Sequence, residues 1–223
     1  MALLHEIRTL VRKEILLEWR QRYALNGMLL YVVSTVWIVY LSFQLAGGQI
    51  GVVTWNALFW ITLLFTSVNA IAKSFMQESR GRQLYYYLLT SPEGLILAKI
   101  VYNVVLMLTL TLVGLVVYGW VLGTPIQDWP LFLLATLLGA VGFAGTLTMV
   151  SGIAAKAGNN TTLMAILSFP IILPMLLMLM RVSKNALDGL DWAASRDELG
   201  VLLAMNMIVV TLSYFLFPYL WRS

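Results

Sequence analysis

Residues 100–122 read IVYNVVLMLTLTLVGLVVYGWVL, a run that contains no charged side chain. An α-helix rises about 1.5 Å per residue, so about 20 apolar residues are enough to cross the roughly 30 Å hydrocarbon core of a bilayer. The run follows Lys99 and is succeeded by a Gly-Thr-Pro turn at residues 123–125. This stretch therefore predicts a transmembrane helix.

Similar apolar runs recur along the chain. Hydrophobic residues make up 61% of the 223 residues and charged residues 11%, whereas soluble domains contain about 25% charged residues. The sequence thus predicts an all-α polytopic membrane protein, with one six-span permease domain over residues 1–223 and no soluble domain. The predicted spans are Leu25–Leu45, Val52–Ala72, Ile100–Leu122, Leu131–Ala154, Thr162–Met180 and Leu199–Leu220.

The positions of lysine and arginine predict the orientation of the chain. Eleven of the 14 lie in the N-terminal arm (1–24), the connection 73–99, the connection between spans four and five, or the tail; the other three lie in 181–198. Basic residues favour the cytoplasmic side. We expect a bacterial inner-membrane protein with both termini and 73–99 in the cytoplasm and 181–198 outside. The net charge of +4 then reflects orientation rather than nucleic-acid binding.

The predicted spans contain no Asp, Glu, Lys, Arg or His. Carriers driven by ion gradients commonly hold ionisable groups in the membrane, so we expect the free energy for any transport to come from a partner. The chain has no cysteine and no G-x-x-x-x-G-K-[ST] phosphate loop. We therefore expect no catalytic residue, no metal site and no bound cofactor. A passive channel, or an enzyme using Lys73, Glu78 and Glu93, remains an alternative.

The polar segment 73–99 contains KSFMQESRGRQ followed by LYYYLL and TSPEG. We predict a short helix over residues 74–89, ended before Pro92. In one interpretation its tyrosines lie among lipid headgroups and Arg80 and Arg82 contact lipid phosphates. In the other it is a coupling helix that docks into a groove of a cytoplasmic ATPase, because Tyr and Arg are favoured interface residues.

Two motifs carry a family resemblance. The stretch ESRGRQLYYYLLTSPEGLILAK at 78–99 is similar to the E-x-x-x-G-x-L-E-x-L-L-L-S-P-x-x-x-x-x-x-x-K stretch of the cytochrome c maturation permease, the haem exporter protein B (CcmB) family of ABC transporters. The stretch GTLTMVSGIAAKAGNNTTLMAILSFPIILP at 145–174 resembles that family's fourth and fifth spans. With the length and span number, the resemblance covers nearly the whole chain.

The resemblance implies a membrane subunit that pairs with a cytoplasmic ATP-binding subunit. It also implies a haem-handling membrane partner and a haem chaperone, with haem as cargo and ATP bound by the partner. Haem export, release of a haem-loaded chaperone, and export of another lipophilic substrate by an ABC-2-type permease all remain open. The expected ATPase-coupling residues are Glu78, Arg80, Gly81, Arg82, Leu84, Tyr85 and Leu88.

The N-terminal arm predicts an amphipathic helix lying in the membrane interface. Its function would be lipid anchoring, although it could also contact the ATPase. The apolar stripe of this helix is Leu4, Ile7, Val11, Ile15, Trp19 and Tyr23.

Small and kinking residues mark spans four and five. Gly139, Gly142 and Gly145 allow close helix packing, either within the chain or at the seam of a homodimer. Pro170 and Pro174 each remove a backbone donor and predict a kink that could flex during transport. Residues 181–198 are expected to form a small surface helix with Leu187, Leu190 and Trp192 toward lipid.

Overall fold

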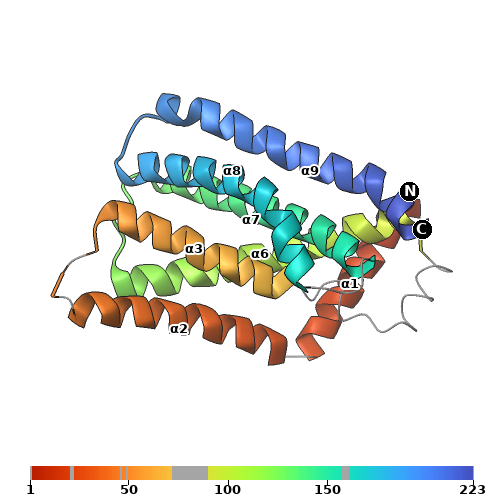
Figure 1. Cartoon of the computed structure of the whole chain (residues 1–223), viewed down its shortest axis with the longest axis horizontal. Helices are drawn as coiled ribbons and strands as arrows, with labels where there is room; N and C mark the ends of the chain where they lie inside the picture. Colours follow the sequence, from red (N-terminus) through yellow and green to blue (C-terminus); the bar gives the residue numbers. More distant parts are fainter. Residues whose placement is uncertain are drawn as a thin grey trace.

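The computed structural model describes residues 2–20, 23–45, 47–48, 50–71, 90–156 and 161–222. Within these residues the chain is helical, and six helices are long and apolar enough to cross a membrane. These six lie side by side, while α1 crosses one end of the bundle near both termini (Figure 1). The helices are α1 Ala2–Arg20, α2 Tyr23–Leu45, α3 Val52–Ile71, α6 Pro92–Leu122, α7 Trp129–Lys156, α8 Thr161–Leu187, the 3-10 helix η1 Trp192–Ser195 and α9 Arg196–Arg222.

The all-helical class is confirmed, and six helices long and apolar enough to cross a membrane match the six predicted spans, but α6 and α8 extend well beyond their predicted ends. Helix α6 begins at Pro92 rather than Ile100. Ser91 is its N-cap, with extended backbone and a side chain that accepts a hydrogen bond from the Gly94 N–H. Capping residues and a proline in the first turn set where a helix starts, whatever the polarity of the next turn. Lys99 therefore lies inside α6.

Helix α8 continues past the predicted end of span five, through Arg181 to Leu187. The expected surface helix with Leu187 toward lipid is wrong at this residue, because Leu187 is buried in the main core. The chain leaves the helix at Gly189, whose φ of 67° is a left-handed conformation that glycine adopts at little cost. Leu190 and Trp192 are exposed, as expected.

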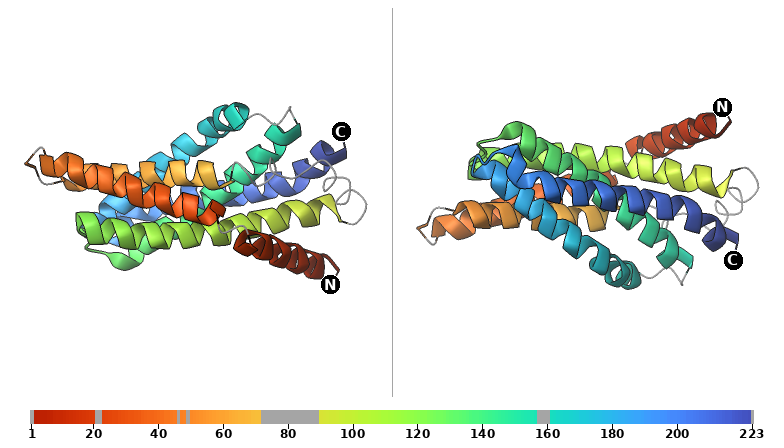
Figure 2. Two further views of the ribbon diagram at one scale, coloured as in Figure 1. Left: turned by 90° about the horizontal axis from the view of Figure 1, so that it is seen from below. Right: turned by 90° about the horizontal axis from the view of Figure 1, so that it is seen from above.

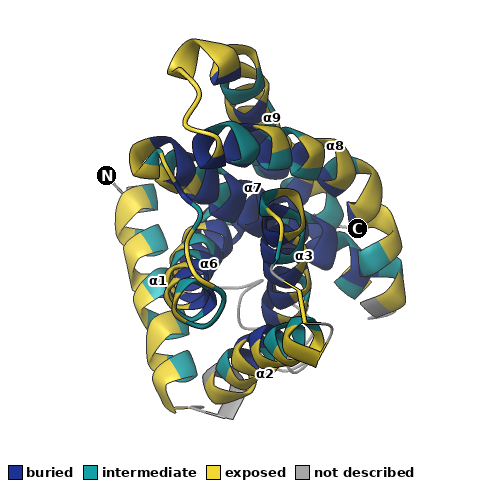
Figure 3. Cartoon of the chain, turned by 90° about the vertical axis from the view of Figure 1, so that its left-hand side faces the viewer, coloured by how far each residue is buried: buried dark blue, intermediate teal, exposed yellow. Residues whose placement is uncertain are grey.

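Helix α7 occupies the centre of the bundle. Figure 3 shows it as largely buried, with exposed surface concentrated on the outer helices. In its apolar window 72% of the residues are buried, against 17% in α2. Aromatic side chains fill the space between α3, α6 and α7: the Trp55 and Tyr118 rings lie 4.9 Å apart and those of Phe59 and Phe132 5.4 Å apart. The core is thus built around α7.

Glycines allow the neighbouring helices to approach α7. A Cβ on Gly139 would lie 2.7 Å from the Trp60 ring of α3, and one on Gly142 would overlap the Met175 sulfur of α8. At Gly145 the nearest side-chain atom, from Val209 of α9, would be 3.3 Å away. All three glycines face helices of the same chain. These buried positions are therefore not available as a seam between two copies.

Helices α3 and α8 also share a buried hydrogen-bond network. The indole N–H of Trp60 donates to Ser183 Oγ over 2.7 Å, and Asn56 donates to the Met180 carbonyl over 2.8 Å. Ser183 Oγ lies 2.7 Å from Asn56 Oδ1 and 2.6 Å from the Leu179 carbonyl, either of which can accept its one proton. Because buried polar groups need partners, this network fixes the position of Trp60 against α8.

Candidate functional site: the contact between α1 and α6

Helix α1 presents three carboxylates to one side. Glu6, Glu14 and Glu18 follow a four-residue spacing, with Leu10 between the first two, so these side chains lie along one face of the helix. Leu10 is buried and packs with side chains of α6 and α9 in an apolar cluster separate from the main core. Figure 2 shows α1 alongside the first turns of α6. We call this contact the α1–α6 seam: Glu6, Glu14 and Glu18 of α1 with Ser91, the N-cap of α6, and with Lys99 and Tyr102 of α6.

Glu6 binds the N-terminus of α6. Its Oε1 accepts a hydrogen bond from the Ser91 backbone N–H over 2.7 Å, and its Oε2 accepts one from the Ser91 hydroxyl over 2.9 Å. A carboxylate is favourable here because the first amides of a helix carry partial positive charge. A Cβ on Gly94 would lie 2.8 Å from the Glu6 side chain. Glycine at this position therefore leaves room for the carboxylate.

Glu14, about two turns further along α1, forms an ion pair with Lys99. Its Oε1 lies 3.5 Å from the Lys99 ammonium and 2.9 Å from that of Lys13. The Lys99 side chain is only 1% exposed. Burial of the Glu14 carboxyl raises its pKa, but attraction to Lys99 and the hydrogen bond from Lys13 outweigh burial, so the pKa is lowered overall. Glu14 is therefore ionised at neutral pH and supplies a negative charge to the buried lysine.

Glu18 completes the seam. The Tyr102 hydroxyl donates a hydrogen bond to Glu18 Oε2 over 3.1 Å. Tyr102 lies about one turn beyond Lys99, and Lys99 lies about two turns beyond Ser91, so the three contacts are spread over the first turns of α6. Each carboxylate of α1 thus has a partner on α6.

The residues predicted from sequence are distributed differently. The seven expected coupling residues between Glu78 and Leu88 lie outside the described residues. Pro170 and Pro174 lie inside α8, which continues through both, and they are exposed on its outer face. The three glycines lie in α7, in the core. The structure brings none of these sets to the seam.

Sequence reasoning missed the seam because it considered the apolar stripe of the arm and assigned no partner to its carboxylates. The spacing of Glu6, Glu14 and Glu18 was a usable signal, since it places three like charges on one helix face. Their partners on α6 lie some 85 positions away and no local pattern indicates them. Among the described residues no group of three His, Cys, Asp or Glu side chains is placed to hold a metal ion. The seam joins two helices rather than forming a reactive centre.

The fold and this seam define the class of protein. Six long apolar helices packed around α7, with a seventh helix fixed across one end, form a multi-pass α-helical membrane protein.

The sequence model of one protein family, described as CcmB protein, matches residues 5–222, and the chain belongs to this family. Its members are ABC-type haem exporter permeases of cytochrome c maturation, so the chain is a transporter membrane subunit of the inner membrane. The resemblance found in the two sequence motifs is thereby confirmed. No curated protein and no solved structure matches the chain.

Proposed function

We propose that this chain couples ATP hydrolysis by a cytoplasmic partner to haem export or to release of a haem-loaded chaperone. The partner docks on residues 73–89, and both termini lie on the same cytoplasmic side. The α1–α6 seam then carries the displacement of the docked segment into the bundle. Two copies of the chain work together beside a haem-handling membrane partner.

The observation that carries this proposal is the double hydrogen bond of Glu6 to Ser91. Ser91 is the N-cap of α6 and lies within the polar segment 73–99, two residues after the part, 73–89, that we expect to receive the ATPase. Its backbone and its side chain are both bound to α1. A movement of the docked segment therefore displaces the start of α6 and α1 together.

Helix α6 offers a route from this end to the centre of the bundle. Asn103 lies one residue after Tyr102 and donates a hydrogen bond to Thr148 of α7 over 2.7 Å. Both side chains are buried, and Thr148 in turn donates to the Ala144 carbonyl. Because α7 contacts most of the other helices, a shift of α6 reaches the bundle through this contact.

Exposed apolar side chains support two further parts of the proposal: that α1 lies in the membrane interface and that two copies of the chain work together. On α1, Leu4 is 75% exposed and Trp19 66% exposed, as suits a helix lying in the interface. Helices α2, α8 and α9 also carry exposed apolar faces. These faces are open to lipid or to a second copy, whereas the glycines of α7 are not.

Charge reversal in the docking segment tests where the ATPase binds. The double variant Arg80→Glu/Arg82→Glu is expected to lose the ATP-binding subunit during affinity purification, because interface arginines with complementary partners are commonly worth 2 kcal/mol or more, about a thirtyfold change in affinity for each. The measurement is the amount of ATPase subunit recovered per chain. Arg196→Glu, on the expected outer side, is the matched control. Full recovery with the double variant would contradict docking on this segment.

Removal of the Glu6 carboxylate tests the transmission step. Glu6→Ala is expected to retain the ATPase subunit but to lower cytochrome c maturation about tenfold, the effect of losing roughly 1.4 kcal/mol of coupling. The measurement is haem-stained c-type cytochrome in cells that contain equal amounts of the chain. His5→Ala changes the neighbouring exposed residue and is expected to leave maturation unchanged. Normal maturation in the Glu6 variant would eliminate the seam as the route of coupling.

A further inference from the structure

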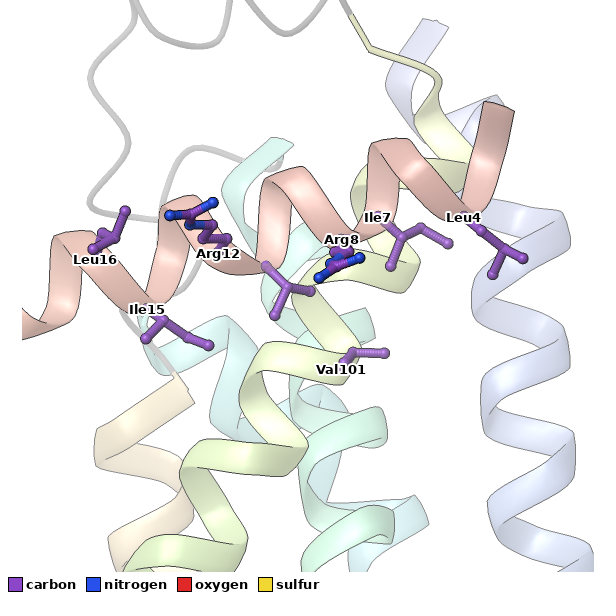
Figure 4. Close-up of a pocket in the computed structure, with 8 residues that line it drawn as sticks. Leu4, Ile7, Arg8, Arg12, Ile15, Leu16 and Val101 are labelled. Atoms are coloured by element: carbon purple, nitrogen blue, oxygen red, sulfur yellow. The ribbon is translucent and has the colours of Figure 1, made fainter. Parts of the chain in front are cut away.

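A groove of about 560 Å³ lies between α1 and the outer face of α6. Its walls are mainly apolar, from Ile7, Val11 and Ile15 of α1 and Val101 of α6, and it also includes Arg8 and Arg12. In Figure 4, Ile7, Arg8 and Ile15 extend from α1 toward the side on which Val101 lies. The groove thus combines an apolar surface with two guanidinium groups one helical turn apart.

The charges of α1 are separated between its faces. The carboxylates Glu6, Glu14 and Glu18 are all directed to α6 and have partners there. Arg8 and Arg12 are exposed, and within the described part of the chain neither forms an ion pair with a carboxylate. The carboxylates of α1 therefore do not neutralise Arg8 and Arg12, and the two guanidinium groups can bind an external anion.

An exposed apolar stripe continues from the groove along α6. Val101 is 44% exposed and Val105 46%, and further along Leu112, Val116 and Trp120 are exposed as well. Spacings of four and seven residues place these side chains on one face of the helix. The groove therefore opens onto a surface that runs along the predicted span, away from the arginines.

We propose that this groove binds one anionic phospholipid. The phosphate lies against Arg8 and Arg12, and an acyl chain follows Val101 and Val105 along α6. Guanidinium groups bind phosphate with two parallel hydrogen bonds, which suits a pair of exposed arginines. A soluble anion would use the arginines but would have no use for the apolar walls. Anionic lipids are also enriched in the leaflet that attracts basic segments next to spans.

Native mass spectrometry of the full-length chain in detergent tests the proposal with two lipids of equal chain length, dioleoylphosphatidylglycerol and dioleoylphosphatidylcholine. We expect one tightly retained phosphatidylglycerol, bound at least about fivefold more tightly than phosphatidylcholine, since each basic residue near the surface contributes about 1 kcal/mol. The variant Arg8→Gln/Arg12→Gln is expected to lose this preference. Arg20→Gln, which changes a charge on the same helix outside the groove, is the matched control and is expected to retain it.

Two further measurements distinguish lipid binding in the groove from attraction of an anion by charge alone. Val101→Trp fills the apolar part without changing charge and is expected to weaken retention of both lipids. Glycerol 3-phosphate supplies the anion without the chains and is expected not to displace the bound lipid. The proposal is overturned if the double arginine variant keeps its preference, if Val101→Trp binds both lipids normally, or if glycerol 3-phosphate competes as well as the lipid. Thermal midpoints of all variants establish that each is folded, and recovery of the ATPase subunit tests the proposed function separately.

Discussion

Replacement of Gly139 by leucine is expected to destabilise the bundle by about 3 kcal/mol or more, the upper part of the range for overpacked cores. The Cβ alone would lie 2.7 Å from one atom of the Trp60 ring, 2.8 Å from another and 3.2 Å from Leu179. Trp60 is fully buried, and its N–H is bound to Ser183, so the ring cannot move aside without breaking that network. The measurement is the thermal midpoint of the purified chain in mild detergent, with the folded yield after extraction.

Two other glycines provide the scale for this experiment. A Cβ on Gly27 of α2 would have no atom within 4 Å, so Gly27→Leu is expected to leave the midpoint unchanged or raise it, because leucine favours helix over glycine. Gly145→Ala should give a small loss, since Val209 would lie 3.3 Å away. If Gly139→Leu and Gly27→Leu have the same thermal midpoint, the close approach of α3 to α7 is wrong.

The six spans were predictable because apolar length alone distinguishes a transmembrane helix. The helix ends were less predictable, and α6 shows why. The hydropathy pattern places its start after Lys99, yet the Ser-Pro pair at 91–92 caps a helix that runs through the lysine. Capping is a local property that the sequence does display, whereas burial of Lys99 depends on a carboxylate in α1. A lone lysine next to a span therefore suggested a helix end at Lys99, where the helix in fact continues.

The arm illustrates a second limit. Its predicted apolar stripe does not all face one environment: Ile7 and Val11 pack against the apolar cluster formed with α6 and α9, whereas Leu4 and Trp19 are exposed. A helix wheel gives the relative positions of these side chains but not which neighbour covers them. The close approaches at Gly139 and Gly142 were only partly predictable for the same reason. Small residues indicated that packing would be tight, while the partners Trp60 and Met175 come from distant helices.

The segment expected to bind the ATPase lies outside the described residues, so its role stays a prediction carried by the motif and the charge pattern. The seam supplies what the sequence did not, namely a physical connection from that segment to α1. Ser91 has this role in the proposal because it lies in the polar segment, two residues after the expected docking region, and is also the N-cap of α6. The family assignment and the geometry therefore address different questions: the first gives the transport class, and the second supports the proposed route from the docked segment to the helices.

Removal of the Glu14 charge is expected to destabilise the chain by about 2 kcal/mol, the usual value for a hydrogen-bonded charged group. Glu14→Gln keeps the shape of the side chain but withdraws the negative charge from beside the buried Lys99 ammonium, 3.5 Å away. In Lys99→Met the buried positive charge is replaced by an apolar side chain of similar length. Their coupling energy in a double-mutant cycle is expected to be about 1–2 kcal/mol, measured from unfolding in detergent at neutral pH.

The pH dependence gives an independent test of the same pair. Because folding lowers the pKa of Glu14, its contribution is present above the unfolded pKa of about 4.3 and is lost as the pH falls through the folded value. Glu14→Gln should therefore remove part of the acid sensitivity of the chain. Asp188→Asn, in the exposed Lys184–Asp188 pair, is the matched control and should change stability by less than about 1 kcal/mol. Equal effects at the two sites would mean that Glu14 and Lys99 interact no more strongly than a surface pair. In that case the seam would rest on Glu6 and the apolar cluster around Leu10 alone.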